Sequence, residues 1–205
     1  MRYFRIVLLA VFSLVVSATQ GQNDSINEAF TLLDSMSSSI SKLGDYEVVF
    51  SVAIGDQSVG GEFVVGGDIY YMELGTAQIY CDGSVKYEVN NGDREIVVDN
   101  VDLKSHNLLN NPTRAFDFLD TQFKATLLRK SENEAEVRLD PLSQDAMSLG
   151  YIVVRVDARS GLPTSIVYDM NGDSVSIVIE SFATSSPPMR FDREEYKNYE
   201  WIDFR

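Results

Sequence analysis

The chain has few residues suited to redox or metal chemistry: among its 205 residues there is one cysteine, Cys81, and one histidine, His106. A single cysteine cannot form a disulfide within the chain. One cysteine and one histidine leave too few ligands for a zinc, copper or iron site, and they leave little for a Cys–His nucleophile pair. The sequence also lacks a glycine-rich phosphate-binding motif and a nucleophile elbow. We therefore expect no metal centre and no bound cofactor.

Basic residues are scarce as well. The chain has 17 Lys and Arg against 31 Asp and Glu, which gives a net charge of −14 at pH 7. Such an acidic surface repels nucleic acid and anionic lipid headgroups, and it steers basic partners toward the protein. An excess of acidic residues is also common in proteins in which it serves only to keep the protein soluble. The charge therefore argues against nucleic acid as a partner without identifying another one.

The first twenty residues have the layout of a secretory signal peptide. Two arginines precede an uncharged apolar run over residues 6–16, and small residues follow it. This pattern predicts a signal peptide over residues 1–18, cleaved after Ala18 or as late as Gly21. The run is shorter than the roughly 18 residues of a membrane-spanning helix. We expect residues 19–205 to form a single exported, soluble domain without a lipid anchor.

The spacing of apolar residues changes at Asp45. From Asp24 to Lys42 they recur at every third or fourth position, which predicts an amphipathic helix with a serine-rich back. After Asp45 the spacing is two, which predicts a long strand at Tyr46–Ile54 and ten further strands separated by Gly, Asn and Asp turns. The ten further strands are 59–65, 69–74, 77–81, 85–89, 94–98, 122–129, 134–139, 151–156, 164–168 and 174–182.

A short segment interrupts the strands at Pro112–Leu119, where Pro112 suits the first position of one or two helical turns. An antiparallel sheet of about eleven strands normally curls, and its concave face has to be covered. The predicted fold class is therefore mainly β (α+β): a strongly curved antiparallel sheet, or unclosed β-barrel, with the two helical segments as a lid. Barrels of this size often enclose a cavity for an apolar ligand.

Large apolar side chains are more numerous than one packed face requires. Tyr70, Tyr71 and Met72 are consecutive in a predicted strand, so they lie on both of its faces. Core packing accounts for one face, and the second indicates a lined cavity or a binding surface. The expected lipid-binding residues are Phe63, Val65, Tyr70, Tyr71 and Met72 from the sheet, Phe30, Leu33 and Met36 from the first helix, and Phe116 and Leu119 from the second helical segment.

Catalytic chemistry has weaker support. Glu134 and Glu136 share one strand face that we expect to meet water, and no carboxylate pair is singled out. Residues 169–173 resemble a calcium loop but lack its remaining oxygen ligands, so a hairpin turn explains them better. We interpret His106 as a solvated loop residue and Cys81 as a half-buried structural thiol.

The order of these elements resembles the periplasmic outer-membrane lipoprotein carriers of the LolA type, in their divergent, Bacteroidetes-like versions. The similarity begins with the N-terminal amphipathic helix and the long strand at Tyr46–Ile54. It continues with the strand Gly61-Glu62-Phe63-Val64-Val65 and with Ile79-Tyr80-Cys81-Asp82-Gly83, a strand ending in an Asp-Gly turn. Tyr87 stands where the family often has tryptophan. The resemblance therefore covers the first half of the domain.

The second half agrees. A Pro-headed insert follows at Asn111-Pro112, and the segment from Phe191-Asp192 to Trp201-Ile202-Asp203-Phe204-Arg205 resembles the family's closing segment. The resemblance implies an unclosed barrel with helices as a lid, whose hydrophobic cavity holds the acyl chains of a lipoprotein in the periplasm. It also implies the partners: acylated lipoproteins, an inner-membrane lipoprotein-releasing complex and an outer-membrane acceptor. We expect a monomer that is not an enzyme.

One departure from the family concerns the lid. Proteobacterial members of the family carry an arginine before a proline after the Gly61-like strand, and it tethers the lid. Here Gly66-Gly67-Asp68 occupies that turn, so we expect a weakly latched lid. Two alternative functions stay open: a lipid-binding or lipoprotein-sensing protein of the same fold, and a secreted carboxylate-dependent hydrolase.

Overall fold

The structure, a computed structural model, describes residues 24–119, 122–147, 150–170 and 172–205. The signal peptide predicted at residues 1–18 lies outside the described residues. Within the described ranges, no helix is long and apolar enough to cross a membrane.

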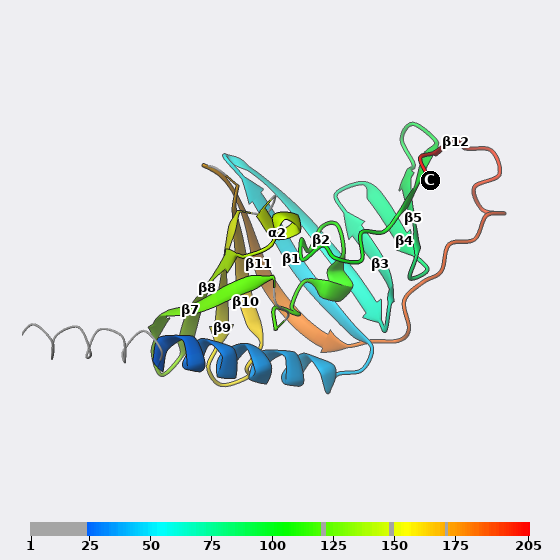
Figure 1. The fold of residues 1–205 in the computed structure, drawn as a ribbon. Coiled ribbons are helices and arrows are strands. Elements are labelled where there is room, and N and C mark those ends of the chain that lie inside the picture. Colours follow the sequence, from blue (N-terminus) through cyan, green and yellow to red (C-terminus); the bar gives the residue numbers. More distant parts are fainter. Residues whose placement is uncertain (1–23, 120–121, 148–149, 171) are drawn as a thin grey trace, which may run out of the picture.

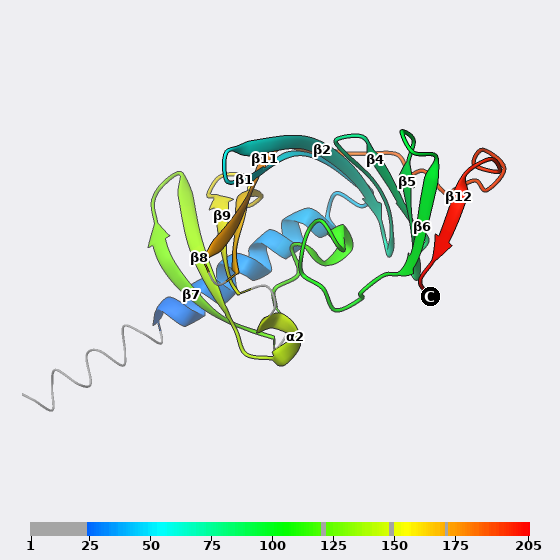
Figure 2. The ribbon, with the colours of Figure 1, turned by 90° about the horizontal axis from the view of Figure 1, so that it is seen from above.

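The described strands form one sheet in the order β12-β6-β5-β4-β3-β2-β1-β11-β10-β9-β8-β7. Their bounds are β1 Tyr46–Ile54, β2 Gln57–Gly66, β3 Ile69–Leu74, β4 Ala77–Cys81, β5 Val85–Asn90, β6 Glu95–Asn100, β7 Phe123–Lys130, β8 Glu134–Pro141, β9 Tyr151–Asp157, β10 Pro163–Met170, β11 Asp173–Thr184 and β12 Glu200–Asp203. All neighbours are antiparallel except β12, which pairs with β6 in parallel. The sheet curves without closing (Figure 2), which confirms the predicted fold class. The eleven predicted strands correspond to β1–β11, and β12 is a further strand within the closing segment that begins at Phe191.

The N-terminal helix covers residues 24–41 among those described and lies in the concavity of the sheet (Figures 1 and 2), as predicted. A second helix, α2, spans only Gln144–Met147 and was not expected from the sequence.

The helical segment predicted at Pro112–Leu119 is shorter than expected. It is one 3-10 turn, η1 (Pro112–Arg114), followed by irregular chain. Phe116 packs against Phe182, whereas Phe118 packs against Phe123. Both phenylalanines are buried in the same core. On a helix, residues two positions apart point to different faces, so a continuous helix would not bury both. A turn at residues 115–116 and irregular chain after it satisfy both contacts.

Two buried clusters lie on opposite faces of the sheet. The concave-face core is the cluster that includes Leu33, Phe63 and Tyr168, and it joins the N-terminal helix to β1–β4 and β7–β11. The convex-face cluster consists of Tyr71, Tyr80, Val89, Ile96, Val98 and Tyr196. The change of face is visible within β4, where Ile79 belongs to the first cluster and Tyr80 to the second.

The C-terminal segment covers the convex-face cluster. We call residues 185–205 the strap; it ends in β12 (Figure 1). Its Phe191 stacks on Tyr87 with ring centroids 4.2 Å apart, and its Tyr196 packs edge-on against Tyr80 at 6.3 Å. Some of the large apolar side chains that we interpreted as lining a cavity therefore pack against the strap instead.

Candidate functional site

The N-terminal helix buries one narrow stripe against the sheet. Leu33 is 1% exposed, and Ala29, Met36 and Ile40 are buried with it in the concave-face core. Phe30 is 37% exposed, because it lies about 100° around the helix from Ala29. The structure therefore brings the predicted residues Leu33 and Met36 to the sheet, and it leaves Phe30 at the rim of the helix–sheet contact.

Most of the sheet residues predicted for the site share the concave face. Phe63 and Val65 of β2 and Tyr70 and Met72 of β3 are buried in the concave-face core. Tyr71 belongs to the convex-face cluster, so its placement in the predicted site is wrong. Side chains alternate along a strand, and Tyr71 therefore cannot share a face with its two neighbours.

A loop fills the concavity beside the helix. We call residues 101–119 the plug (Figure 2). Its Leu108, Phe116 and Phe118 are buried in the concave-face core, and Leu119 packs against that core. The plug makes few backbone bonds to the sheet; one joins the Val101 N–H to the Ser84 carbonyl at 2.9 Å. Side-chain packing and side-chain hydrogen bonds thus hold most of it in place.

Two tyrosine hydroxyls of the sheet bind the backbone of the plug. The hydroxyl of Tyr168 on β10 donates to the carbonyl of His106 at 2.9 Å and accepts from the N–H of Leu108 at 3.0 Å. The hydroxyl of Tyr70 on β3 donates to the carbonyl of Asn110 at 3.2 Å. Burial raises the pKa of both phenols above the ordinary value, so both stay protonated and able to donate. The plug is therefore latched by two strands that lie on either side of β1.

His106 is buried, so its interpretation as a solvated loop residue is wrong. The residue is 1% exposed, and its ring packs against those of Phe118 and Phe123, with centroid separations of 5.7 and 5.2 Å; the two phenylalanine rings also contact each other. Its Nδ1 lies 3.2 Å from the carbonyl oxygen of Arg114, and its Nε2 lies 3.3 Å from Nε2 of Gln122. The imidazole therefore anchors the plug from within rather than facing water.

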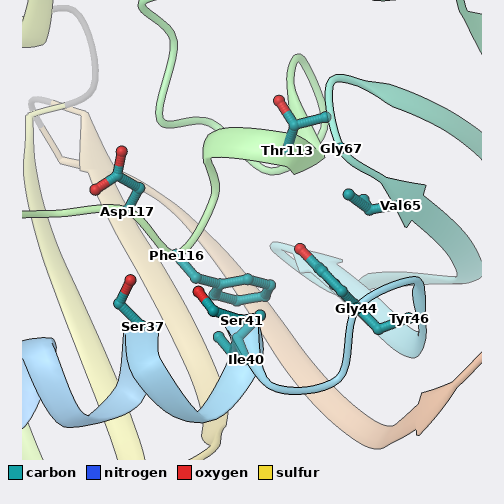
Figure 3. A pocket seen from close by; sticks show the side chains of 10 residues that line it. All are labelled: Ser37, Ile40, Ser41, Gly44, Tyr46, Val65, Gly67, Thr113, Phe116 and Asp117. Atoms are coloured by element: carbon teal, nitrogen blue, oxygen red, sulfur yellow. The ribbon is translucent and has the colours of Figure 1, made fainter.

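A cavity of about 420 Å³ opens between the end of the helix, the plug and the β2–β3 turn (Figure 3). Its lining residues are Ser37, Ile40, Ser41, Gly44, Tyr46, Val65, Gly67, Thr113, Phe116 and Asp117. Of the residues predicted for the site, Val65 and Phe116 line it. The lining is mixed, because serine, threonine and aspartate side chains face the cavity together with the apolar ones. The purely apolar part of the concavity is filled by the helix and the plug.

Gly67 lies at the edge of this cavity, in the turn between β2 and β3. Its φ of +61° lies in the left-handed region, which favours glycine. No atom outside its neighbours lies within 4 Å of the position that a Cβ would occupy. The backbone of the turn thus favours glycine, and the plug is held by the tyrosine latch.

The carboxylates considered for catalysis are ion-paired. Glu134 lies 2.7 Å from Arg129, and Glu136 lies 2.9 Å from Arg155 and 3.8 Å from Arg129. These pairs join neighbouring strands, which accounts for their spacing. Within the described ranges there is no group of three or more His, Cys, Asp and Glu side chains suited to a metal ion.

Cys81 is a buried free thiol at the end of β4. Burial raises the pKa of this thiol, which keeps it protonated and unreactive. Its Sγ accepts a hydrogen bond from the Gly83 N–H at 3.3 Å. The position agrees with a structural role.

The latch could not be found from the sequence. Tyr168 falls in a predicted strand, and its partners Leu108 and His106 lie about sixty residues earlier in an irregular segment. No spacing rule links a strand residue to a loop over such a distance. The one available signal was the pair of leucines within the otherwise polar run from Ser105 to Asn111.

The comparisons concern the fold. No protein-family model matches the chain, and no curated protein matches it. An uncharacterised conserved protein from Thermus thermophilus has a similar structure, with a TM-score of 0.55 and 9% identity, over 86% of this chain and 99% of that chain. Two weaker matches are a LolA superfamily protein from Nitrosomonas europaea and LprF from Mycobacterium bovis. The Nitrosomonas protein has a TM-score of 0.43 and 9% identity, over 78% of this chain and 94% of that chain. LprF has a TM-score of 0.40 and 13% identity, over 80% of this chain and 97% of that chain.

At these identities the similarity concerns architecture alone. The described residues form an unclosed, curved antiparallel sheet with a helix in its concavity, which is the architecture that the sequence resemblance implied. The architecture that the resemblance implied is therefore confirmed, and the protein from Thermus thermophilus shares this fold.

Proposed function

We propose that the protein is a periplasmic carrier that binds the acyl chains of lipoproteins against the concave face of the sheet and delivers them toward the outer membrane. The proposal rests on the way in which the concave face of the sheet is covered. An apolar surface spanning β1–β4 and β7–β11 is covered by one amphipathic helix and by the plug, rather than by a second sheet. Such a cover can be displaced while the sheet keeps its ladder of hydrogen bonds.

The energetics of loading support this reading. Burial of an acyl chain contributes about 0.8 kcal/mol per methylene group. The side chains that an acyl chain would replace, Leu108, Phe116 and Phe118 of the plug, are apolar themselves. One apolar cover would be exchanged for another, so neither state exposes a large apolar face to water. Release would then require an acceptor whose site is more apolar, or one that stabilises the plugged state.

The predicted export signal and the acidic charge fit this role. An exported carrier without a lipid anchor can move between the two membranes, and a net charge of −14 keeps it away from anionic headgroups. In this proposal the donor is an inner-membrane lipoprotein-releasing complex, and the acceptor lies at the outer membrane.

A disulfide that fixes the helix tests the proposal. A Cβ at Gly161, in the β9–β10 turn, would lie 3.8 Å from the Cβ of Ser39 on the helix, a separation typical of disulfides. We expect the oxidised Ser39→Cys/Gly161→Cys protein to lose uptake of a triacylated lipopeptide, because the helix can no longer leave the sheet. Reduction should restore uptake.

The matched control joins two turns of the sheet instead. A Cβ at Gly83 would lie 3.5 Å from the Cβ of Asp68, and Gly83, like Gly161, has a positive φ. The oxidised Asp68→Cys/Gly83→Cys protein should take up the lipopeptide as the unmodified protein does. Failure of the unmodified protein to bind the lipopeptide would refute the carrier function. Binding of free lipid alone would favour the alternative, a lipid-binding protein of the same fold.

A further inference from the structure

The two latch hydroxyls are polar groups in an otherwise apolar surface. Tyr70 and Tyr168 are each 1% exposed, and both belong to the concave-face core. The bonds that Tyr168 makes go to the plug backbone, through the His106 carbonyl and the Leu108 N–H. Tyr70 bonds the Asn110 carbonyl and also lies beside the Cys81 thiol. Neither phenol therefore has a strong acceptor on the sheet itself.

Displacement of the plug removes these acceptors. If a bare hydrocarbon took the place of the plug, both O–H groups would be left unpaired inside an apolar site, which is costly. A ligand that brings its own acceptor to the same depth avoids this cost. The groups bonded there now are peptide carbonyls, and an ester or amide carbonyl is an acceptor of the same kind and size.

From this geometry we propose that Tyr70 and Tyr168 bind the carbonyl groups that join acyl chains to their headgroup, so that the site prefers acyl esters and amides to ether lipids and hydrocarbons. The inference rests on the proposed carrier function and specifies its ligand class. In the plugged state Tyr168 also accepts the Leu108 N–H, which belongs to a different peptide group from the His106 carbonyl, so an ester or amide linkage replaces the carbonyl contact. The closed structure thus contains, in the plug backbone, a mimic of the ligand's linkage.

Two lipids that differ only in their carbonyls provide the test. We would measure the dissociation constants of 1,2-didecanoylglycerol and of 1,2-di-O-decylglycerol by displacement of a hydrophobic dye from the purified protein. Both ligands require the same displacement of helix and plug, so the ratio of their constants is free of that shared cost. We expect the preference for the ester, relative to the ether, to fall about two- to tenfold in Tyr168→Phe and in Tyr70→Phe, the factor expected for one hydrogen bond.

The matched control is Tyr80→Phe. Tyr80 is buried in the convex-face cluster, away from the proposed site, and its hydroxyl pairs with that of Tyr196 in the strap at 3.0 Å. Its ester-to-ether ratio should equal that of the unmodified protein. An unchanged ratio in both latch variants overturns the inference while the carrier function stands. If neither lipid displaces the dye from the unmodified protein, the carrier function fails and this inference fails with it.

Discussion

The hydroxyl of Tyr168 accepts a hydrogen bond from the backbone N–H of Leu108, 60 positions earlier in the chain, and at the same time donates to the carbonyl of His106. One side chain of the sheet thus satisfies two backbone groups of a buried loop. An irregular segment inside a core needs such partners, because its backbone has no ladder of its own.

The first prediction concerns this bond. Tyr168→Phe leaves the Leu108 N–H and the His106 carbonyl without their partner, so the free energy of unfolding should fall by about 1–3 kcal/mol. Urea denaturation measures the loss, and hydrogen exchange at the Leu108 amide should accelerate. Tyr46→Phe removes the hydroxyl of a cavity-lining tyrosine that makes no such bond, and its effect should stay within about 0.5 kcal/mol. Equal losses in the two variants would show that the latch contributes nothing.

The second prediction concerns alkaline pH. Burial raises the pKa of Tyr46, Tyr70 and Tyr168 well above the ordinary value near 10. A tyrosine whose pKa is higher in the folded than in the unfolded protein stabilises the fold. This contribution is fully present below the pKa of the unfolded chain, and it is lost as the pH rises above about 10. Ultraviolet absorbance of the phenolate should show these tyrosines ionising together with unfolding. In denaturant all tyrosines should titrate near pH 10, and early ionisation of the folded protein would contradict the burial.

The third prediction concerns His106. His106→Ala removes a buried ring packed against Phe118 and Phe123, so we expect a loss of about 2 kcal/mol or more in unfolding free energy. Leu103 lies in the same plug but is 58% exposed, and Leu103→Ala should cost less than about 0.5 kcal/mol. Thermal and urea unfolding compare the two. If His106→Ala left the free energy of unfolding unchanged, the residue would be solvated, as expected from the sequence.

The fourth prediction concerns the turn of Gly67. An arginine is the residue that the family resemblance led us to consider at this turn, but the φ of +61° disfavours a side chain. Gly67→Arg should therefore destabilise the protein by about 1 kcal/mol. Gly67→Asn should cost less, since asparagine adopts the left-handed region more easily. If arginine proves the more stable of the two, contacts across the cavity outweigh the backbone strain.

The fifth prediction separates the two sides of the N-terminal helix. Leu33→Glu places a carboxylate in the concave-face core, where an unpaired charge costs about 3–5 kcal/mol, and uptake of lipopeptide should disappear. Ser38→Glu puts the same charge on the exposed back of the helix and should change neither stability nor uptake. Because Leu33 is buried, unfolding has to be measured beside uptake in the same preparation. Loss of uptake in the Ser38 variant would contradict the site.

Local patterns predicted most of the fold. The period of two located β1–β11, and β3 and β4 agree with their predicted bounds at Ile69–Leu74 and Ala77–Cys81. The helix stripe through Leu33 and Met36 followed from spacing alone. These successes share one cause, since each element buries one face and that face repeats within a few residues.

Long-range contacts set the limits of the prediction. Tyr71 was assigned to the site because alternation shows that β3 has two apolar faces but not which element covers each. The strap that covers Tyr71 and Tyr80 lies more than a hundred residues later, as the 3.0 Å contact between the hydroxyls of Tyr80 and Tyr196 shows. The burial of His106 and the latch of Tyr168 depend on the same kind of contact.

The parallel pairing of β12 with β6 has a consequence for self-association. Without the strap, β6 would expose unpaired backbone groups next to an uncovered aromatic face, a combination that invites edge-to-edge aggregation. The other edge strand, β7, is defended by exposed Lys124, Arg129 and Lys130 instead. A truncated chain that ends before residue 185 should therefore be prone to form oligomers through β6, whereas β7 should stay inert.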